Sequence, residues 1–261
     1  MGWNKRYSLD GCKSNRNCDL FYLVNRGYYP NSAWNPNRKK LRLCVVIQLD
    51  EGIPVADEAS VNLAIAFAAA VFKDQANVKI ISANDTDDDY IRIAKESSDD
   101  DTLVVGCKAD GWKEDIGPTG DKFRTLMSEY CGGEWRRIIG YAAPICAFAV
   151  KRFADCDPTN PSVGCTAGCG VGPTTDYVTV NFYNKDNNNI DPTTGKPKVL
   201  DSTYSTLGHE MGHACNLWHE EDSSNLMHGS YTLLTTNPNQ RRELTRWQKA
   251  SIRASRHVTF F

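Results

Sequence analysis

Three of the five histidines in this 261-residue chain fall within one short segment, His209 to His219, which reads HEMGHACNLWH. The first two are four residues apart, a spacing that places both imidazoles on one face of a helix, where both can bind one metal ion. A third ligand for the same metal ion cannot come from that helix face, so the chain has to leave the helix and return from another direction. Asn216 stands where this turn is needed, and asparagine tolerates a left-handed backbone better than most residues. The segment therefore predicts a helix from about Ser202 to Cys215 and a turn directly after it.

The residue types in this segment suit zinc. Zinc prefers four ligands in a tetrahedron, and a catalytic zinc site uses three protein ligands and leaves one position to water. We therefore predict His209, His213 and His219 as metal ligands. Glu210 follows the first ligand directly, and a carboxylate beside activated water can act as general base and then as general acid. The pattern predicts a hydrolytic zinc site.

The segment resembles the signature of the metzincin clan of zinc metalloproteases, His-Glu-x-x-His-x-x-Gly-x-x-His followed by a methionine-containing turn. Asn216 replaces the usual glycine, and Met227 lies eight residues beyond His219, where the Met-turn of the clan would place it beneath the zinc. The resemblance implies a zinc metalloendopeptidase that hydrolyses proteins or peptides.

The subgroup within the clan is left open by the residues after the third histidine. Glu220 resembles the astacin subgroup, but Gly229 stands at the position of the additional tyrosine ligand of that group. Tyr231 lies nearby and is a candidate contact to the substrate or the transition state. We predict no subgroup.

The order of hydrophobic segments predicts an α+β fold. We expect a twisted mixed five-stranded sheet with a long backing helix and the metal-binding helix, and a small C-terminal subdomain with the Met-turn and a final helix. The expected strands are Leu41–Leu49, Val78–Ser82, Thr102–Cys107, Ile145–Val150 and Tyr177–Tyr183. The expected helices are Ala56–Gln75, with Pro54 in its first turn, Asp121–Tyr130, and a last helix opened by a Thr245–Gln248 capping box and ending near Arg256. By resemblance, Ile145–Val150 would form the cleft edge on which an extended substrate pairs.

Charge and hydropathy argue against two classes of partner. The formal net charge is -2 and the pI is about 6.2, which gives no electrostatic reason to expect nucleic acid or an anionic membrane as a partner. No apolar run reaches the roughly 18–20 residues of a membrane-spanning helix. The expected partner is a protein or peptide substrate, and the oligomeric state is not predicted.

The ten cysteines are scattered along the chain, a distribution that favours disulfides in an oxidising compartment over a metal cluster. We therefore expect a secreted protein, although the start of the sequence lacks the apolar core of a signal peptide. Residues 1–40 are polar and turn-rich and predict an N-terminal extension or the remnant of a pro-segment, and residues 41–261 predict the catalytic domain. Cys215 is expected to be a disulfide partner or a buried thiol.

Other interpretations stay open from the sequence. A catalytically silent or latent zinc-binding protein would have a fourth protein ligand, such as Cys12, Cys18 or Asp19 of the extension. A metal-dependent amidase or aminopeptidase would have a closed, one-ended pocket. A calcium ion at Asp186–Asp191 is weakly supported, because the segment lacks the spacing of a calcium loop. His228 and His257 are expected to be surface or hydrogen-bonded histidines.

Overall fold

The computed structural model describes residues 39–84, 89–107, 118–154, 166–170, 175–182, 202–229 and 241–260. Its central element is the twelve-residue strand β1 (Lys39–Asp50), whose sequence KKLRLCVVIQLD is rich in β-branched and apolar residues. Eight of its twelve residues in one continuous run are buried, as expected for a strand that is covered on both faces.

The sheet is mixed and is organised around β1. Parallel partners of β1 are β3 (Val78–Ser82), β4 (Ile91–Ser97) and β6 (Ile145–Ala149), and its antiparallel partners are β2 (Ile53–Pro54) and β10 (Val258–Thr259). The sheet continues from β6 to the parallel strand β9 (Tyr177–Val180) and ends with the antiparallel strand β8 (Gly168–Cys169). A separate two-stranded sheet joins β5 (Val104–Val105) to β7 (Arg152–Phe153).

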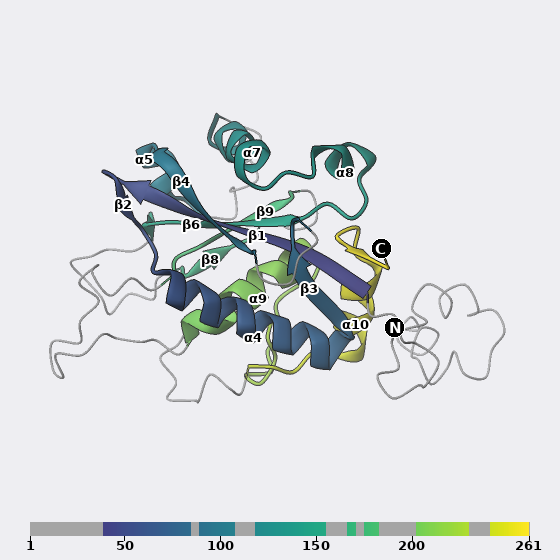
Figure 1. The fold of residues 1–261 in the computed structure, drawn as a ribbon. Coiled ribbons are helices and arrows are strands. Elements are labelled where there is room, and N and C mark those ends of the chain that lie inside the picture. The colour runs from purple at the N-terminus through teal and green to yellow at the C-terminus, as the bar shows by residue number, and fades with distance from the viewer. Residues whose placement is uncertain are drawn as a thin grey trace, which may run out of the picture.

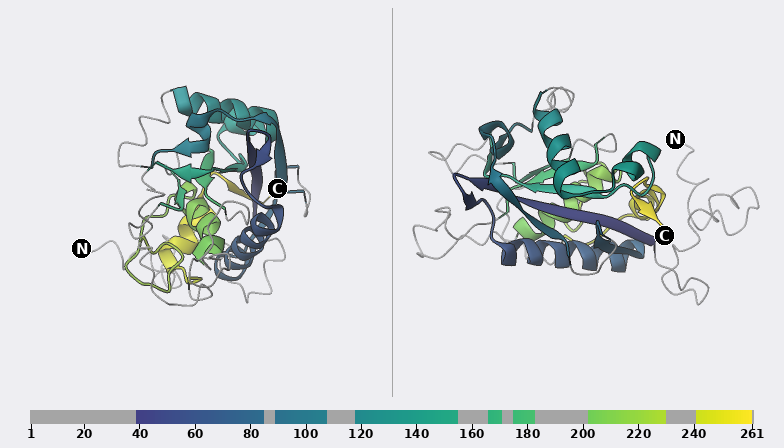
Figure 2. Two further views of the ribbon diagram at one scale, coloured as in Figure 1. Left: turned by 90° about the vertical axis from the view of Figure 1, so that its left-hand side faces the viewer. Right: turned by 45° about the horizontal axis from the view of Figure 1, so that its top comes forward.

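Helices cover both faces of the sheet (Figures 1 and 2). On one face, α4 (Glu58–Ala76) and α9 (Ser202–Ala214) pack on alternate residues of β1 such as Leu43 and Val45. On the other face, Val46 packs in one cluster with Phe123 and Met127, which lie about one turn apart on α7 (Pro118–Tyr130). The short helices α5 (Asp100–Leu103) and α8 (Glu134–Ile139) lie on the same side as α7 (Figure 1).

The last helix, α10 (Arg246–Ala254), connects the C-terminal part to α4. Arg253 is fully buried, and its guanidinium donates hydrogen bonds to the carbonyls of Ala76 (2.8 Å) and Asn77 (3.1 Å), where α4 ends. A cation at this end of a helix is favourable because the helix dipole is negative there. Asn77 itself has a left-handed backbone, with φ 53°.

The predicted α+β class is confirmed, with a twisted mixed sheet, the long backing helix α4 and the helix α9 that carries the first two histidines of the segment. Within the described residues the sheet has eight strands: four of the five expected, and in addition β4 and the two-residue strands β2, β8 and β10. The fifth expected strand, Thr102–Cys107, contributes β5 to the separate sheet. The extension over residues 1–38 lies outside the described residues, while Lys39 and Lys40 already belong to β1.

Four local predictions are wrong. Pro54 belongs to β2, and α4 begins only at Glu58, since Asp57 caps it by accepting from the amides of Ala59 and Ser60. Thr102–Cys107 starts as the end of helix α5, so its strand is short. Strand β4 was not predicted, because among its residues only Ala94 is buried. Tyr177–Tyr183 is a strand only to Val180 and is buried rather than half-buried.

The predicted position of Ile145–Val150 at the cleft edge is also wrong. Strand β6 lies inside the sheet, between β1 and β9, and all five of its residues are buried. The strand at the end of the sheet is β8, which is next to β9.

In the described part of the chain no helix is both long enough and apolar enough to cross a bilayer.

Candidate metal centre

Helix α9 and the turn that ends it bring together the three histidines that are predicted as metal ligands. Asn216 has φ 65°, the left-handed conformation expected from its place in the sequence. The amide of Leu217 donates to the carbonyl of Gly212 at 3.0 Å, the bond that closes this type of helix end. The chain then reverses and carries His219 back toward α9.

The Nε2 atoms of His209, His213 and His219 form a nearly equilateral triangle. Their separations are 3.1 Å from His213 to each of the other two and 3.2 Å between His209 and His219. Three ligands of a tetrahedral zinc ion at 2.0–2.1 Å would be about 3.3 Å apart, so the triangle has the size that zinc requires. In the described part of the chain these are the residues whose side chains form such a ligand group.

Backbone carbonyls orient two of the rings. The Nδ1–H of His209 donates to the carbonyl of Leu226, and that of His213 donates to the carbonyl of Leu217, each at 2.8 Å. These bonds place the proton on Nδ1 and leave the Nε2 lone pair free for a metal. The pKa of His209 is lowered to about 3, mainly by burial and to a smaller extent by the neighbouring His213. Burial also lowers the pKa of His213. Both rings are therefore neutral at physiological pH, as metal binding requires.

Glu210 is on the same helix and is 3% exposed. Burial raises the pKa of its carboxyl to about 8, against a lowering contribution from a hydrogen bond with the backbone of Gly170. A cation held by the three histidines would lower this pKa, since an opposite charge favours the carboxylate. The metal and the carboxylate thus suit each other electrostatically.

The edge strand β8 forms a wall against Glu210, and this contact was not predicted. A Cβ built on Gly168 would lie 2.5 Å from Oε1 of Glu210, and one built on Gly170 would lie 3.0 Å from Cβ of His213. The backbone of β8 approaches the site this closely only because both positions are glycine. The signal in the sequence was the Gly-Cys-Gly triplet at 168–170, but nothing local connects it to a helix some forty residues later.

Met227 packs against α9 at Gly212. It is fully buried, and its Sδ occupies the space that a side chain at Gly212 would need. Gly229 packs its backbone against the ring of His219, since a Cβ there would be 2.8 Å from Nδ1. The position at which astacins have a tyrosine ligand is thus a close packing contact in this protein.

A polar chain anchors the methionine turn to α10. Buried Asn225 accepts the amide of Met227 at 2.8 Å and donates from Nδ2 to Oε1 of Gln248 at 2.9 Å. Gln248 is the predicted capping-box residue of α10, and the capping box with Thr245 is confirmed. Because the carbonyl of Leu226 in the same turn holds His209, α10 is connected to the predicted metal ligands.

The remaining predicted residues have different outcomes. His257 is buried and bonded through Nδ1 to the carbonyl of Ala143 at 2.9 Å, and His228 contacts the carbonyl of Glu220 at 3.2 Å. Tyr231, the calcium candidate Asp186–Asp191 and the latency candidates of residues 1–38 lie outside the described residues.

Cysteine pairing is confirmed at one position. Cys107 and Cys169 form a disulfide, whereas Cys215 is a buried thiol, one of the two possibilities expected for it. Three further thiols of the described chain, Cys44, Cys131 and Cys146, are buried as well.

Known proteins resemble this chain only distantly. No protein-family model matches the sequence, and no curated protein matches it. Among solved structures, metalloproteinase-II from Bacteroides fragilis is similar, with a TM-score of 0.44 and 12% identity over 88% of this chain. This chain spans 60% of the length of that protein. A zinc-dependent peptidase from Methanocorpusculum labreanum is similar with a TM-score of 0.42 and 14% identity, over 80% of this chain and 99% of that one. Likeness at this level does not assign an activity, which has to follow from the residues of the site.

Proposed function

We propose that the protein is a zinc-dependent endopeptidase of metzincin type. The observation that carries this proposal is the triangle of three Nε2 atoms, 3.1–3.2 Å apart, with the buried carboxyl of Glu210 on the same helix. His209, His213 and His219 would hold the ion. His219 is exposed, so the site can be reached from solvent.

When bound, zinc supplies a Lewis acid that polarises a peptide carbonyl and lowers the pKa of a water molecule. Glu210 would accept a proton from the attacking water and would then donate it to the nitrogen of the leaving amine. The carbonyls of Leu226 and Leu217 keep His209 and His213 in the orientation that this chemistry needs.

The shape of the sheet supports an endopeptidase over an enzyme that acts on chain ends. Strand β8 is the last strand on its side of the sheet in the described chain, directly beside Glu210. An extended peptide can pair with such an edge through main-chain hydrogen bonds and continue in both directions. In this proposal the strand that pairs with the substrate is β8, in place of Ile145–Val150.

The disulfide between Cys107 and Cys169 supports an oxidising compartment, and we therefore propose secretion as the location. Fractionation of the native host would test this, since protein found with all ten cysteines reduced in the cytosol would contradict it.

The decisive experiment replaces Glu210 by glutamine. We expect Glu210→Gln to keep one zinc per chain, measured by atomic absorption, and to lose roughly 10²–10⁴-fold in kcat on a peptide library blocked at both ends. Glu221→Gln is the matched control, because this carboxylate is exposed and lies two residues beyond His219, the third histidine of the site. Substantial proteolysis by Glu210→Gln would contradict the role of Glu210. Zinc binding without any turnover in the wild type would favour the silent zinc protein, and cleavage only of peptides with a free amino terminus would favour an aminopeptidase.

A further inference from the structure

Strand β8 is in contact with the proposed reaction centre through its backbone. Glycines on both sides of Cys169 lie against Glu210 and His213, with no side chain between them. The position of Glu210 therefore depends on the position of β8, because a shift of this strand changes the wall against which the carboxyl packs.

The sheet holds β8 by few bonds. Within the described ranges its two residues pair with β9 alone, in the register Gly168 with Val180 and Cys169 with Thr179. One further backbone bond joins the amide of Asn181 to the carbonyl of Ala167 at 2.9 Å, and the hydroxyl of Thr179 contacts the carbonyl of Cys169 at 3.4 Å. A two-residue strand at the end of a sheet is among the least stable elements of a fold, since such segments open locally first.

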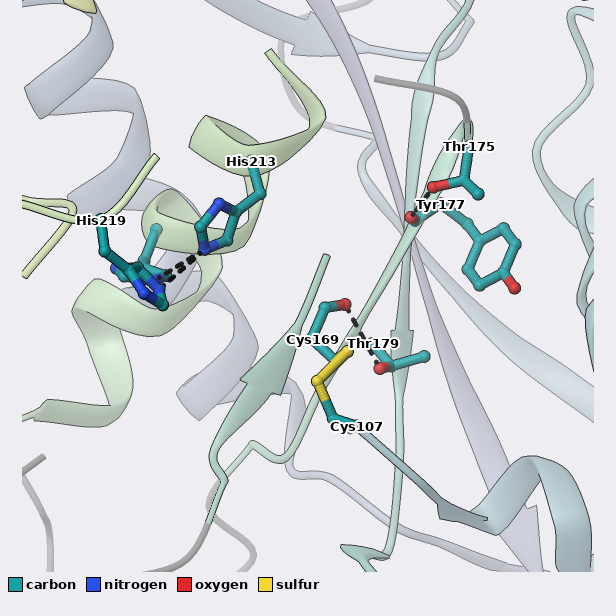
Figure 3. The surroundings of a disulfide bond; sticks show 8 residues. Cys107, Cys169, Thr175, Tyr177, Thr179, His213 and His219 are labelled. Atoms are coloured by element: carbon teal, nitrogen blue, oxygen red, sulfur yellow. Dashed lines mark hydrogen bonds between the residues drawn. A yellow bond between two sulfur atoms is a disulfide. The ribbon is translucent and has the colours of Figure 1, made fainter. Parts of the chain in front are cut away.

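A covalent bond fixes β8 from a second direction. Cys169 is bonded to Cys107, 62 positions earlier, in the segment that follows β5. Strand β5 is itself anchored, because it pairs with β7 and because the amides of Lys151 and Ala154 donate to the carbonyls of Leu103 and Val105, each at 2.9 Å. Figure 3 shows the Cys107–Cys169 disulfide at β8, with His213 of α9 and His219 from the chain beyond α9 to one side of it.

We propose that the Cys107–Cys169 disulfide is a positioning device for Glu210: it holds β8 against α9, and its reduction lowers turnover without releasing the metal. The inference rests on the proposed peptidase function. Reduction by a phosphine is balanced by one water molecule: the S–S bond breaks, each sulfur gains a proton, and the phosphine becomes its oxide. Cys107 and Cys169 act through β8 and do not touch the substrate's reacting atoms.

The experiment compares the zinc-loaded wild type before and after treatment with tris(2-carboxyethyl)phosphine, and the double variant Cys107→Ala/Cys169→Ala. We expect reduction to lower kcat on a blocked peptide on the order of 10- to 100-fold, because an active group misplaced by about 1 Å loses this much. The double variant should have the lowered kcat from the start and show no further effect of phosphine. Cys131→Ala, which removes a buried thiol on the α7 side of the sheet, is the matched control and should respond to phosphine as the wild type does.

Two readouts do not depend on catalysis. Zinc content should stay at one per chain after reduction, and hydrogen exchange should become faster in residues 166–170 while the amides of α9 remain protected. These readouts keep the inference testable when the double variant folds poorly, because the reduced wild type can then be measured alone.

Each outcome separates the inference from the proposed function. Unchanged kcat and unchanged exchange after complete reduction would overturn the inference and leave the peptidase proposal in place. A rise in KM with unchanged kcat would also overturn it, since the bond would then act on substrate binding rather than on Glu210. Loss of zinc on reduction would mean that the bond maintains the metal site itself. A wild type without any activity would refute the peptidase proposal. In that case, faster exchange at residues 166–170 after reduction would still support the hold of the disulfide on β8, and unchanged exchange would overturn it.

Discussion

At the scale of single residues, the site depends on positions that lack a side chain. Gly168 and Gly170 let the backbone of β8 reach Glu210, Gly212 leaves room for Met227, and Gly229 lies against His219. None of these four glycines has a positive φ, so they are required for space rather than for backbone conformation. An added methyl group is therefore a sharp probe of the site.

Gly168→Ala should inactivate the protein while leaving the fold in place. Its Cβ would lie 2.5 Å from Oε1 and 2.6 Å from Cγ of Glu210, so the carboxyl side chain has to move. We expect kcat to fall about 10²-fold with little change in zinc content. Steady-state kinetics with metal analysis would test this, and a variant with wild-type kcat would show that Glu210 has room to adapt.

At the scale of elements, the local parts of the site could be predicted from the sequence and the assembled parts could not. The convergence of the three histidines, the turn at Asn216 and the capping box of α10 each depend on residues a few positions apart, and the structure shows all three. The order of strands in the sheet depends on long-range pairing, and the edge position that the resemblance implied for Ile145–Val150 is wrong because β6 is central. The contact of β8 with Glu210 has the same origin and left no periodic pattern to read.

The link between the methionine turn and α10 provides a prediction at this scale. Asn225→Ala removes the acceptor for the Met227 amide and the donor to Gln248, both buried. We expect the free energy of unfolding to fall by about 2 kcal/mol because a buried polar group loses its partner. Zinc affinity should fall about 10-fold, since Leu226 of this turn orients His209. Urea unfolding and a competitive zinc titration would measure these effects, and unchanged affinity would show that the turn does not act on the ligand.

At the scale of the whole molecule, the metal should contribute to global stability. The three histidines come from α9 and from the chain beyond it, and the unfolded chain cannot hold them in a triangle. A ligand that binds only the folded state at a thousand times its Kd stabilises by about 4 kcal/mol. Removal of zinc by a chelator should lower Tm by roughly 10 °C for a chain of this size. Calorimetry would check this, and re-addition of zinc should restore the original Tm.

A second prediction for the whole molecule concerns alkaline pH. The pKa of Lys39 is lowered from 10.5 to about 8, mainly by burial and to a smaller extent by the charge of Arg253. Between these values the unfolded chain keeps a proton that the folded protein has released, so the free energy of unfolding rises with pH in this window. Relative to Lys39→Met, the wild type should gain about 2 kcal/mol between pH 7 and pH 10. Urea unfolding of both proteins at each pH would test the sign, and a constant difference between them would contradict it.

The pairing of β1 with β10 joins segments that are made at very different times. Lys40 pairs with Thr259, and Lys39 places its ammonium 4.7 Å from the ring centre of Phe260. During translation β1 is made before β3, β4, β6 and finally β10, so it stays partly unpaired until these partner strands are made. Unpaired apolar strands on nascent chains are prone to associate with each other. We therefore expect overproduction to give aggregates unless translation is slowed or a chaperone shields β1.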